Sequence, residues 1–294
     1  MKKKYKTVQN LIMSLQKYWE KQGCSIIQPI DIQVGAGTFH PATFFNTIGS
    51  NNTSLAYTQI SRRPRDGRYG KNINRLQQYY QFQVIIKPPP KNIKDIYLKS
   101  LKKLNISTKK NDIRFIEDNW ENPTLGACGI GWEIWINGME VTQFTYFQQM
   151  GGLDCNPISV EITYGIERIA MHSQEINNIF DIIWDENQFK IVKYKDLFYK
   201  NEIEQSNYNF KIADTELISL LFKKYLKESI RIINIEKSLI IPAYENMLKA
   251  CHYFNLLESR KAISTTERQK YILEIRYVTN KIAKTYIEKN NNIE

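Results

Sequence analysis

A strand that turns into a helix carries two charged side chains whose positions need an explanation. The stretch "SVEITYGIERIAM", residues 159–171, alternates apolar and polar residues like a strand and continues after Gly165 as an apolar helical run. Glu161 lies on the strand, and Arg168 lies in the first turn of the helix. Because the helix dipole disfavours a cation there, Arg168 is expected to face an anion. That anion is either a carboxylate at the surface or a bound phosphate.

Further candidate anion ligands are concentrated in one polar segment. Only eleven arginines occur in 294 residues, and five of them fall within "SRRPRDGRYGKNINR": Arg62, Arg63, Arg65, Arg68 and Arg75. The chain uses lysine almost everywhere else, and the planar fork of arginine suits phosphate oxygens better than a lysine point charge does. We interpret this segment as a phosphate-binding loop between two strands.

Two carboxylates are predicted to share one face of a hairpin. The Asn-Gly pair at residues 137–138 is the preferred pair for a two-residue turn. The resulting register places Glu133 opposite Thr142, and makes Glu133 and Glu140 diagonal neighbours about 7–8 Å apart. A magnesium ion bound together with phosphates would relieve their repulsion. The alternative is a solvated face that binds nothing.

The elements that must position these residues are mostly strands joined by loops. A helix is predicted at residues 7–22 and another at 91–106. Strands are predicted within residues 24–38, 54–64, 78–90 and 111–121, in a hairpin at 131–147, and in the opening stretch. Because regular βαβ crossovers are missing from this order, we expect an α+β fold. Its mainly antiparallel sheet would be flanked by helices, unlike a doubly wound nucleotide-binding fold.

The sequence pattern after about residue 176 predicts helices. The segment that begins "STTERQ" has Ser264 and Glu267 in capping-box spacing. Its apolar positions recur at steps of four, three and four, as on the buried face of a helix: Tyr271, Ile275, Val278 and Ile282. We predict a catalytic domain over residues 1–175 and a helical C-terminal domain over residues 176–294.

Composition limits the function classes. The net charge of +11 and the pI of 9.3 favour a polyanionic partner, although abundant surface lysine accounts for part of the charge. Four cysteines and three histidines are scattered without metal-ligand or disulfide spacing. The sequence has no apolar run of membrane-spanning length, and its basic start lacks the apolar segment of a secretory signal. We therefore expect a cytoplasmic protein without a membrane partner.

Two of these segments resemble signature motifs of class II aminoacyl-tRNA synthetases. "EITYGIER" is similar to motif 3, in which an arginine at a strand–helix junction binds ATP. "SRRPRDGRYG" followed by "QYYQFQ" is similar to motif 2, in which a strand, an arginine, a loop and a second strand surround ATP. One departure is that Arg62 and Arg63 are followed by Pro64, and not by the usual arginine-x-glutamate pattern.

Longer runs resemble one family within that class. "YWEKQGCSIIQPIDIQVGAGT", "RDGRYGKNINRLQQYYQFQVIIKP", "EDNWENPTLGA" and "NGMEVTQFTYFQQMGGLDC" are similar to the alpha subunits of the bacterial heterotetrameric glycyl-tRNA synthetases, nearly end to end. The resemblance implies the class II antiparallel sheet flanked by helices, followed by a helical domain. It also implies a glycine-tRNA ligase, which activates glycine with ATP to glycyl-adenylate and transfers the glycyl group to tRNA(Gly).

The resemblance assigns the ATP-binding roles as follows. Arg168 would face the triphosphate. Arg63, or its neighbour Arg62, would hold the α-phosphate, and Arg68 would reach the outer phosphates. Phe82 would stack on the adenine ring.

The resemblance also assigns the remaining site residues. Glu133 and Glu140 match an acidic pair that holds Mg²⁺ and ATP in relatives. Glu161 would bind the ammonium group of glycine, with Thr163 on the same face of the strand. Trp120 would either wall the pocket against larger side chains or belong to the ordinary core.

The family further implies partners. Two alpha and two beta chains would form the enzyme, with the beta subunit carrying most of the tRNA recognition and the alpha chains pairing near "QPIDIQ". Two alternatives remain open at this point. One is an adenylate-forming ligase of the same fold that does not act on tRNA, and the other is a non-catalytic nucleic-acid-binding remnant.

Overall fold

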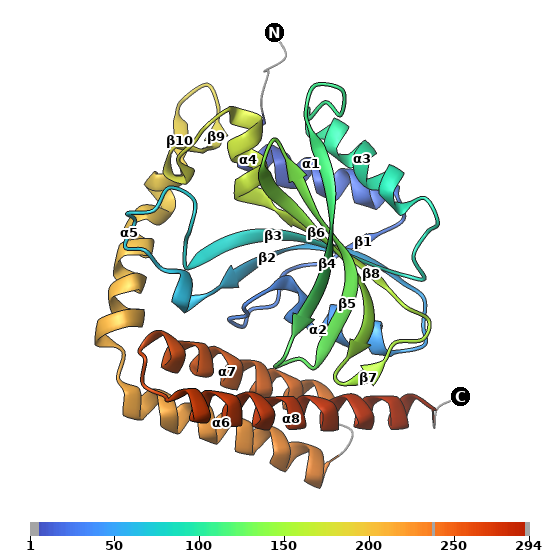
Figure 1. Ribbon diagram of the computed structural model, residues 1–294, viewed down its shortest axis with the longest axis vertical. Helices are drawn as coiled ribbons and strands as arrows, with labels where there is room; N and C mark the ends of the chain where they lie inside the picture. Colours follow the sequence, from blue (N-terminus) through green and yellow to red (C-terminus); the bar gives the residue numbers. More distant parts are fainter. Residues whose placement is uncertain (1–5, 237–238, 292–294) are drawn as a thin grey trace.

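An eight-stranded sheet forms the centre of the molecule (Figure 1). The computed structural model describes residues 6–236 and 239–291, so the first five residues of the basic start lie outside it. Along the sheet the strand order is β1-β2-β3-β8-β6-β5-β4, and β7 pairs with β6. Only the β1–β2 pairing is parallel. The strands are β1 (Ser25–Ile26), β2 (Thr53–Arg62), β3 (Gln78–Lys87), β4 (Ile113–Asn122), β5 (Ala127–Ile136), β6 (Met139–Met150), β7 (Leu153–Asp154) and β8 (Val160–Gly165).

Helices lie on both sides of the sheet and at one end of the molecule. They are α1 (Val8–Lys21), α2 (Pro41–Ile48), α3 (Ile93–Lys103), α4 (Ile166–Gln174), α5 (Tyr194–Asn207), α6 (Thr215–Ile235), α7 (Ile240–Ser259) and α8 (Thr265–Asn291). A small hairpin, β9 (Ile183–Glu186) and β10 (Ile191–Lys193), precedes α5. The predicted α+β fold with an antiparallel sheet flanked by helices is confirmed. Among the described residues, no helix combines the length and apolarity that crossing a membrane would need.

One face of the sheet packs against α1, α3 and α4, and we call it the helix-covered face. Its side chains are fully buried and apolar in the central strands: Phe82, Val84, Phe144, Ile162 and Tyr164. They share one core with Leu11 of α1, Tyr97 of α3 and Ile169 of α4. This face holds α1, α3 and α4 in place, because burial of such side chains contributes about 1.5–3 kcal/mol each.

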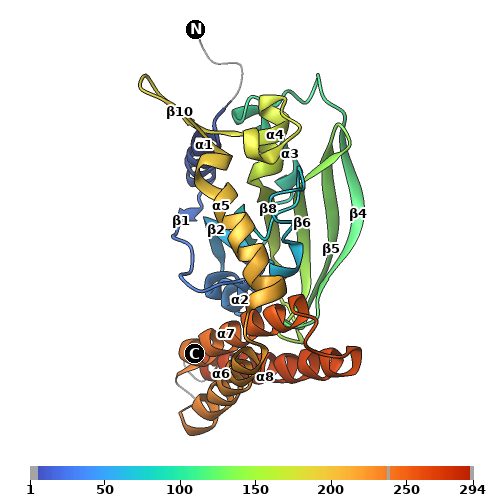
Figure 2. The same cartoon turned by 90° about the vertical axis from the view of Figure 1, so that its left-hand side faces the viewer.

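The opposite face is divided between apolar packing and a polar surface. At one end, Ile85 and Phe147 join a second core formed with α2 and the C-terminal helices. Figures 1 and 2 both place α6–α8 together at that end of the molecule. The remainder of this face carries polar side chains on neighbouring strands, and we call it the polar face: Gln81, Gln83, Gln143, Thr145, Glu161 and Thr163.

The C-terminal helices have the predicted core. Tyr271, Ile275, Val278 and Ile282 are 9%, 0%, 2% and 0% exposed. The predicted capping box is also present, because the Ser264 hydroxyl accepts from the Glu267 N–H and Glu267 accepts from the Ser264 N–H.

The segment between the sheet and α6 differs from the sequence expectation. It contains the β9–β10 hairpin as well as helix α5, and Tyr194 of α5 joins the core under the helix-covered face. The domain boundary after residue 175 stays a prediction.

Candidate active site

A cavity of about 990 Å³ opens on the polar face. Strands β3, β6 and β8 form its floor, residues 63–77 form one wall, and α7 closes another side. We call residues 63–77 the arginine loop. Five arginine side chains line the cavity: Arg63, Arg65, Arg68, Arg75 and Arg168. Carboxylates line the cavity as well, and three of these arginines are paired with one: Arg65 with Glu258, Arg75 with Asp66 and Arg168 with Glu140. The cavity therefore combines an arginine-rich rim, partly neutralised by carboxylates, with a polar floor.

Arg168 lies where the strand–helix junction was expected to place it. Gly165 ends β8 and caps α4, so that the Arg168 side chain projects from the first turn of the helix. Its Nη1 donates to the Glu140 carboxylate at 2.6 Å and to the Glu140 carbonyl oxygen at 3.1 Å. The anion that the dipole argument requires is thus present as Glu140. Because Arg168 remains 46% exposed and lines the cavity, it is also accessible to a ligand.

The two candidate ligands for the α-phosphate, Arg62 and Arg63, differ in whether they line the cavity. Arg62 is the last residue of β2 and does not line the cavity, whereas Arg63 does. The Arg63 Nε donates to the Gly35 carbonyl oxygen at 2.9 Å, and its guanidinium lies 5.2 Å from the centre of the Tyr79 ring. Arg68 lines the cavity, with its Nη1 donating to the Gly67 carbonyl oxygen at 2.6 Å.

Glu161 is a buried carboxylate on the cavity floor. It is 2% exposed, and its Oε2 accepts from the Thr38 hydroxyl at 2.8 Å and from the Thr163 hydroxyl at 3.4 Å. Burial raises the pKa of Glu161 to about 7, and the neighbouring Thr38, Gln83 and Thr163 side chains offset part of that rise. A carboxylate in this position can accept a proton or a cation near neutral pH.

Three buried polar atoms around Glu161 have no hydrogen-bond partner. They are Glu161 Oε1, the Gln83 side-chain nitrogen and the Thr145 hydroxyl. Thr145 lies directly opposite Glu161 in the strand register, and Gln83 lies opposite Thr163. Unpaired buried polar atoms are costly, at about 1–3 kcal/mol each. Three unpaired atoms therefore lie close together in the strand register, and of their residues Glu161 lines the cavity.

The predicted register of the Glu133–Glu140 pair is wrong by one residue, and the role of the pair in binding magnesium stays a prediction. Val141 is the extra residue of a β-bulge, so Glu133 lies opposite Gln143 and not opposite Thr142. The Glu133 carboxylate accepts from the Trp135 indole at 2.9 Å and does not line the cavity. Glu140 does line it. No group of three His, Cys, Asp or Glu side chains suited to a metal occurs in residues 6–236 and 239–291, so Glu140 would need substrate phosphates to complete a magnesium site.

The adenine-stacking prediction for Phe82 is also wrong. Phe82 is 0% exposed on the helix-covered face, where its ring packs edge-on against Tyr164 at 6.0 Å between centroids. Side chains alternate along β3, so Tyr79 and Gln81 project to the cavity instead. Tyr79 lines the cavity next to Arg63 and is the aromatic residue available to a base.

The remaining predicted residues lie at the cavity. Thr163 donates to Gln83 Oε1 at 2.9 Å and lines the floor beside Glu161. Trp120 of β4 lines the far side, and its ring packs edge-on against Phe147 at 5.6 Å. Trp120 therefore lines the cavity and also packs against a residue of the core.

Several cavity residues were not predicted from the sequence. The alternation that identifies Glu161 and Thr163 on β8 would also have identified Tyr79 and Gln81 on the neighbouring strand. Thr38 gave no such signal, because it comes from a short turn more than a hundred residues before Glu161 in the chain.

Comparison with known proteins identifies the family of the chain. The family model described as glycyl-tRNA synthetase alpha subunit matches residues 8–291. The glycine–tRNA ligase alpha subunit of Buchnera aphidicola subsp. Baizongia pistaciae is 62% identical over 284 residues, which cover 96% of this chain and 95% of that protein. The corresponding subunit of Wigglesworthia glossinidia brevipalpis is 59% identical over 281 residues, covering 96% and 93%.

Solved structures give a weaker likeness. A pyrrolysyl tRNA synthetase from Desulfitobacterium hafniense aligns with 63% of this chain and 75% of its own, at a TM-score of 0.45 and 9% identity. At this TM-score and identity, the likeness does not identify a family. The full-length family match and the two relatives show that the chain belongs to the glycyl-tRNA synthetase alpha-subunit family.

Proposed function

We propose that the cavity binds ATP and glycine side by side and joins them as glycyl-adenylate. One observation carries the proposal: unpaired polar atoms surround the buried Glu161 carboxylate, directly beside a rim of five arginines. A small zwitterion and a polyphosphate match these two halves of the cavity. Membership of the glycyl-tRNA synthetase alpha-subunit family supports that choice of ligands.

Glycine would lie on the floor of the cavity. Its ammonium group would approach Glu161 Oε1, which has no partner, while Thr38 and Thr163 hold the other oxygen. An ionised carboxylate next to an ammonium group is the stronger form of such a hydrogen bond. The unpaired Gln83 nitrogen and Thr145 hydroxyl would provide further polar contacts. Trp120 would limit the space available to larger side chains.

ATP would lie along the arginine rim. Arg63 is the better candidate for the α-phosphate, because Arg62 lies outside the cavity. Arg168 and Arg68 would contact the outer phosphates, and the Tyr79 ring would contact the base. Mg²⁺ held by Glu140 and the phosphates would neutralise charge on the triphosphate.

The chemistry needs no side-chain nucleophile. A carboxylate oxygen of glycine attacks the α-phosphorus of ATP, a new P–O bond forms, and the bond to the leaving pyrophosphate breaks. The protein would contribute by holding the reacting atoms in line and by stabilising the charge that develops on the phosphates. Positively charged side chains already fixed around the α-phosphate need no reorganisation during the step.

We further propose that charging of tRNA(Gly) requires a beta subunit, in an assembly of two alpha and two beta chains located in the cytoplasm. The relatives are named alpha subunits, which supports a second kind of chain. Pairing of the alpha chains near residues 28–33 belongs to the same proposal.

Two assays test the proposed function. Glycine-dependent ATP–pyrophosphate exchange is measured with a panel of amino acids, and glycyl transfer to tRNA is measured with and without the beta subunit. We expect exchange with glycine alone and transfer only when both chains are present. Exchange with another acid would support a ligase paralogue, and RNA binding without exchange would support a non-catalytic remnant. Efficient transfer by this chain alone would contradict the need for a partner.

A further inference from the structure

A buried carboxylate outside the cavity holds the arginine loop. Glu202 of α5 is 3% exposed and does not line the cavity. Its Oε1 accepts from the backbone N–H of Arg68 at 2.9 Å, and its Oε2 accepts from the backbone N–H of Gln77 at 3.0 Å. The two oxygens of one side chain therefore fix the middle and the end of the loop.

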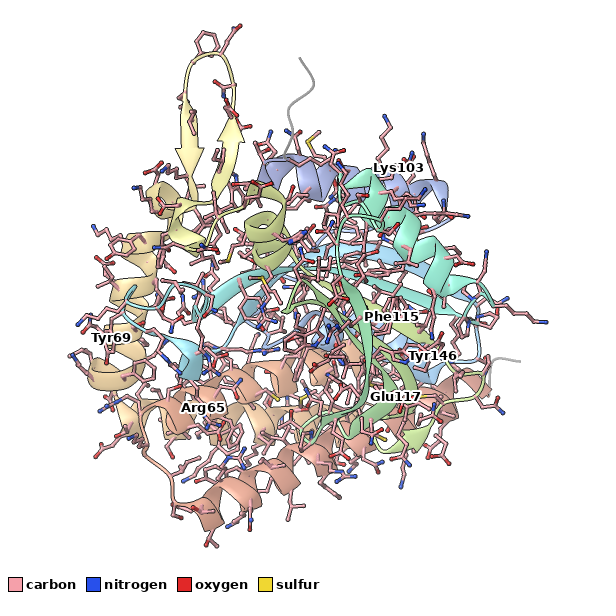
Figure 3. All side chains as sticks on the ribbon, turned by 45° about the horizontal axis from the view of Figure 1, so that its top comes forward. Arg65, Tyr69, Lys103, Phe115, Glu117 and Tyr146 are labelled. Atoms are coloured by element: carbon pink, nitrogen blue, oxygen red, sulfur yellow. The ribbon has the colours of Figure 1, made fainter. Side chains whose placement is uncertain are left out.

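A serine one turn further along α5 extends this contact. The Ser206 hydroxyl donates to Glu202 Oε1 at 3.3 Å and accepts from the backbone N–H of Tyr69 at 3.0 Å. Figure 3 shows Tyr69 beside α5, whereas Arg65 lies near α7. Arg65 donates to Glu258 of α7 at 3.2 Å. The loop is thus attached to both helices, and its backbone is attached to α5.

At two glycines, the backbone of the arginine loop lies directly against side chains of α5, with no room for a loop side chain between them. A Cβ atom added at Gly67 would come within 2.7 Å of the Ser206 hydroxyl oxygen. One added at Gly70, where φ is +71°, would come within 2.6 Å of the Tyr199 ring. Glycine at these two positions permits the close approach that brings the loop N–H groups to the Glu202 carboxylate.

The contact at Gln77 continues to a cavity arginine. The backbone N–H of Arg63 donates to the Gln77 carbonyl oxygen at 2.7 Å. The same residue that donates to Glu202 therefore accepts from Arg63. Gln77 thus connects the Glu202 carboxylate to the backbone of Arg63, through the two peptide groups that share its Cα atom, so the carboxylate contributes to the position of Arg63 as well as that of Arg68.

Burial of Glu202 is costly. Removal from water raises the pKa of this carboxyl, and the N–H groups of Arg68 and Gln77 offset part of the rise. Its partners are backbone N–H groups and one hydroxyl. Buried carboxylates need good partners to be tolerated, and here the partners belong to one functional loop.

We propose that Glu202 is a positioning residue that holds the arginine loop in its phosphate-binding conformation before ATP arrives. The inference rests on the proposed function, which makes ATP the ligand of that loop. Without the carboxylate, ATP would have to order the loop as it binds, and that cost would be subtracted from its affinity. Glycine binds on the cavity floor, away from the loop, and would be unaffected.

The test compares Glu202→Gln with Glu204→Gln in the complete enzyme. The amide keeps the shape of Glu202 but directs an NH₂ group at one of the two N–H donors. We expect the KM for ATP to rise about tenfold, the loss that one charge-assisted hydrogen bond produces, with the KM for glycine within about twofold of wild type. Glu204 is the matched control, because its side chain is 66% exposed and pairs with Lys200 on the same helix. Its variant should behave as wild type.

A second readout does not depend on catalysis. Trypsin should cleave the arginine loop faster in Glu202→Gln than in wild type, and ATP should suppress the difference. Equal cleavage rates and an unchanged KM for ATP in the folded variant would overturn the proposal. A similar rise in both KM values would also overturn it, because that result indicates a general structural role. If wild type itself shows no glycine-dependent exchange, the proposed function fails, while the cleavage comparison still tests Glu202.

A milder variant covers the case in which Glu202→Gln does not fold. Ser206→Ala removes the hydroxyl that accepts from the Tyr69 N–H and donates to Glu202 Oε1. We expect a rise of about threefold in the KM for ATP, because the loop loses one backbone contact while Glu202 keeps both of its backbone donors. A KM for ATP equal to that of wild type in this variant would then overturn the proposal.

Discussion

The two faces of strands β3 and β8 carry side chains of opposite character. On the helix-covered face, the strands present Phe82, Val84, Ile162 and Tyr164, all 0% exposed. On the polar face, the same strands present Gln81, Gln83, Glu161 and Thr163. Successive residues of a strand point to opposite sides. One pair of strands therefore supplies an apolar core and a binding surface at once.

Buried polar atoms without a partner occur on both faces, Thr58 Oγ1 among them on the helix-covered side, but on the polar face they lie close to one carboxylate. The hydroxyl of Tyr164, under the helices, interacts with both Trp19 and Ser100. On the polar face, Glu161 Oε1 and the Gln83 side-chain nitrogen remain unpaired although buried. The comparison indicates that the covered face maintains the fold while the polar face tolerates a local cost for a ligand. Substitutions on the two faces should therefore change different observables.

The largest effect is expected at the rim of the polar face. Arg168→Ala should lower the rate of glycine-dependent pyrophosphate exchange by about 100- to 1,000-fold, the usual loss when one preorganised group in a charge-stabilising site is removed. Its melting temperature should remain within a few degrees of wild type, because the side chain is 46% exposed. Arg231→Ala, at an exposed arginine–glutamate pair on α6, is the matched control. Exchange at the wild-type rate in Arg168→Ala would remove this residue from the site.

A pair of aromatic variants separates the two faces directly. Phe82→Ala should lower the free energy of unfolding by about 3–5 kcal/mol, because it opens a cavity in the core. Tyr79→Ala should instead raise the KM for ATP about tenfold, the scale of one base–aromatic contact. Urea denaturation and exchange kinetics measure the two quantities. A raised KM for ATP in a folded Phe82 variant, without such a change at Tyr79, would reverse the assignment of faces.

The kcat/KM for glycine and the free energy of unfolding should change with pH in opposite directions. Glu161 has a pKa of about 7 in the folded protein, above its ordinary value of 4.5. If ionised Glu161 binds the ammonium group, kcat/KM for glycine should rise about tenfold per pH unit below 7 and level off above it. Stability should change the other way. The folded state binds the extra proton between about pH 4.5 and 7, so the free energy of unfolding falls as pH rises through that interval.

Glu161→Gln isolates this contribution. Glu167 is also buried with a pKa of about 7 and adds its own pH dependence to stability. The difference between wild type and Glu161→Gln, measured by urea denaturation at pH 5 and pH 8, removes the Glu167 term. We expect the variant to be relatively more stable at pH 8 than at pH 5. The same relative stability at both pH values would contradict a raised pKa for Glu161.

The smallest effect distinguishes two carboxylates of the β5–β6 hairpin. Glu140→Gln should raise the magnesium concentration needed for half-maximal exchange severalfold, because its carboxylate lies in the cavity. Glu133→Gln should change it less than twofold, since Glu133 is bonded to the Trp135 indole outside the cavity. Magnesium titrations of both variants measure the difference. Equal sensitivity would restore the paired site that the sequence suggested.

The sequence predicted elements well where the pattern is periodic and local. Helix α8 and its buried face follow from the spacing of Tyr271, Ile275, Val278 and Ile282. The hairpin turn at residues 137–138 follows from its Asn-Gly pair, whose φ angles are both positive. The strand–helix junction at Gly165 was visible for the same reason, because each of these signals lies within a few neighbouring residues.

Other features depend on information that is not local. An unsuspected bulge at Val141 shifted the register by one residue and placed Gln143, not Thr142, opposite Glu133. Phe82 was chosen by similarity to a motif, although alternation from Glu161 across the paired strands favours Tyr79. Glu202 contacts a loop more than a hundred residues earlier in the chain, and its sequence neighbourhood gives no sign of that contact.

The central claim is that the polar face of β8 binds glycine beside ATP. It is tested most directly by glycine-dependent ATP–pyrophosphate exchange in Glu161→Gln, with Glu117→Gln, an exposed residue of β4, as the control. We predict a loss of at least about 100-fold in kcat/KM for glycine in Glu161→Gln, the scale for a lost charge-assisted contact that leaves buried groups unpaired. The KM for ATP should change little, and the control should match wild type. Undiminished kcat/KM for glycine in Glu161→Gln would contradict the account.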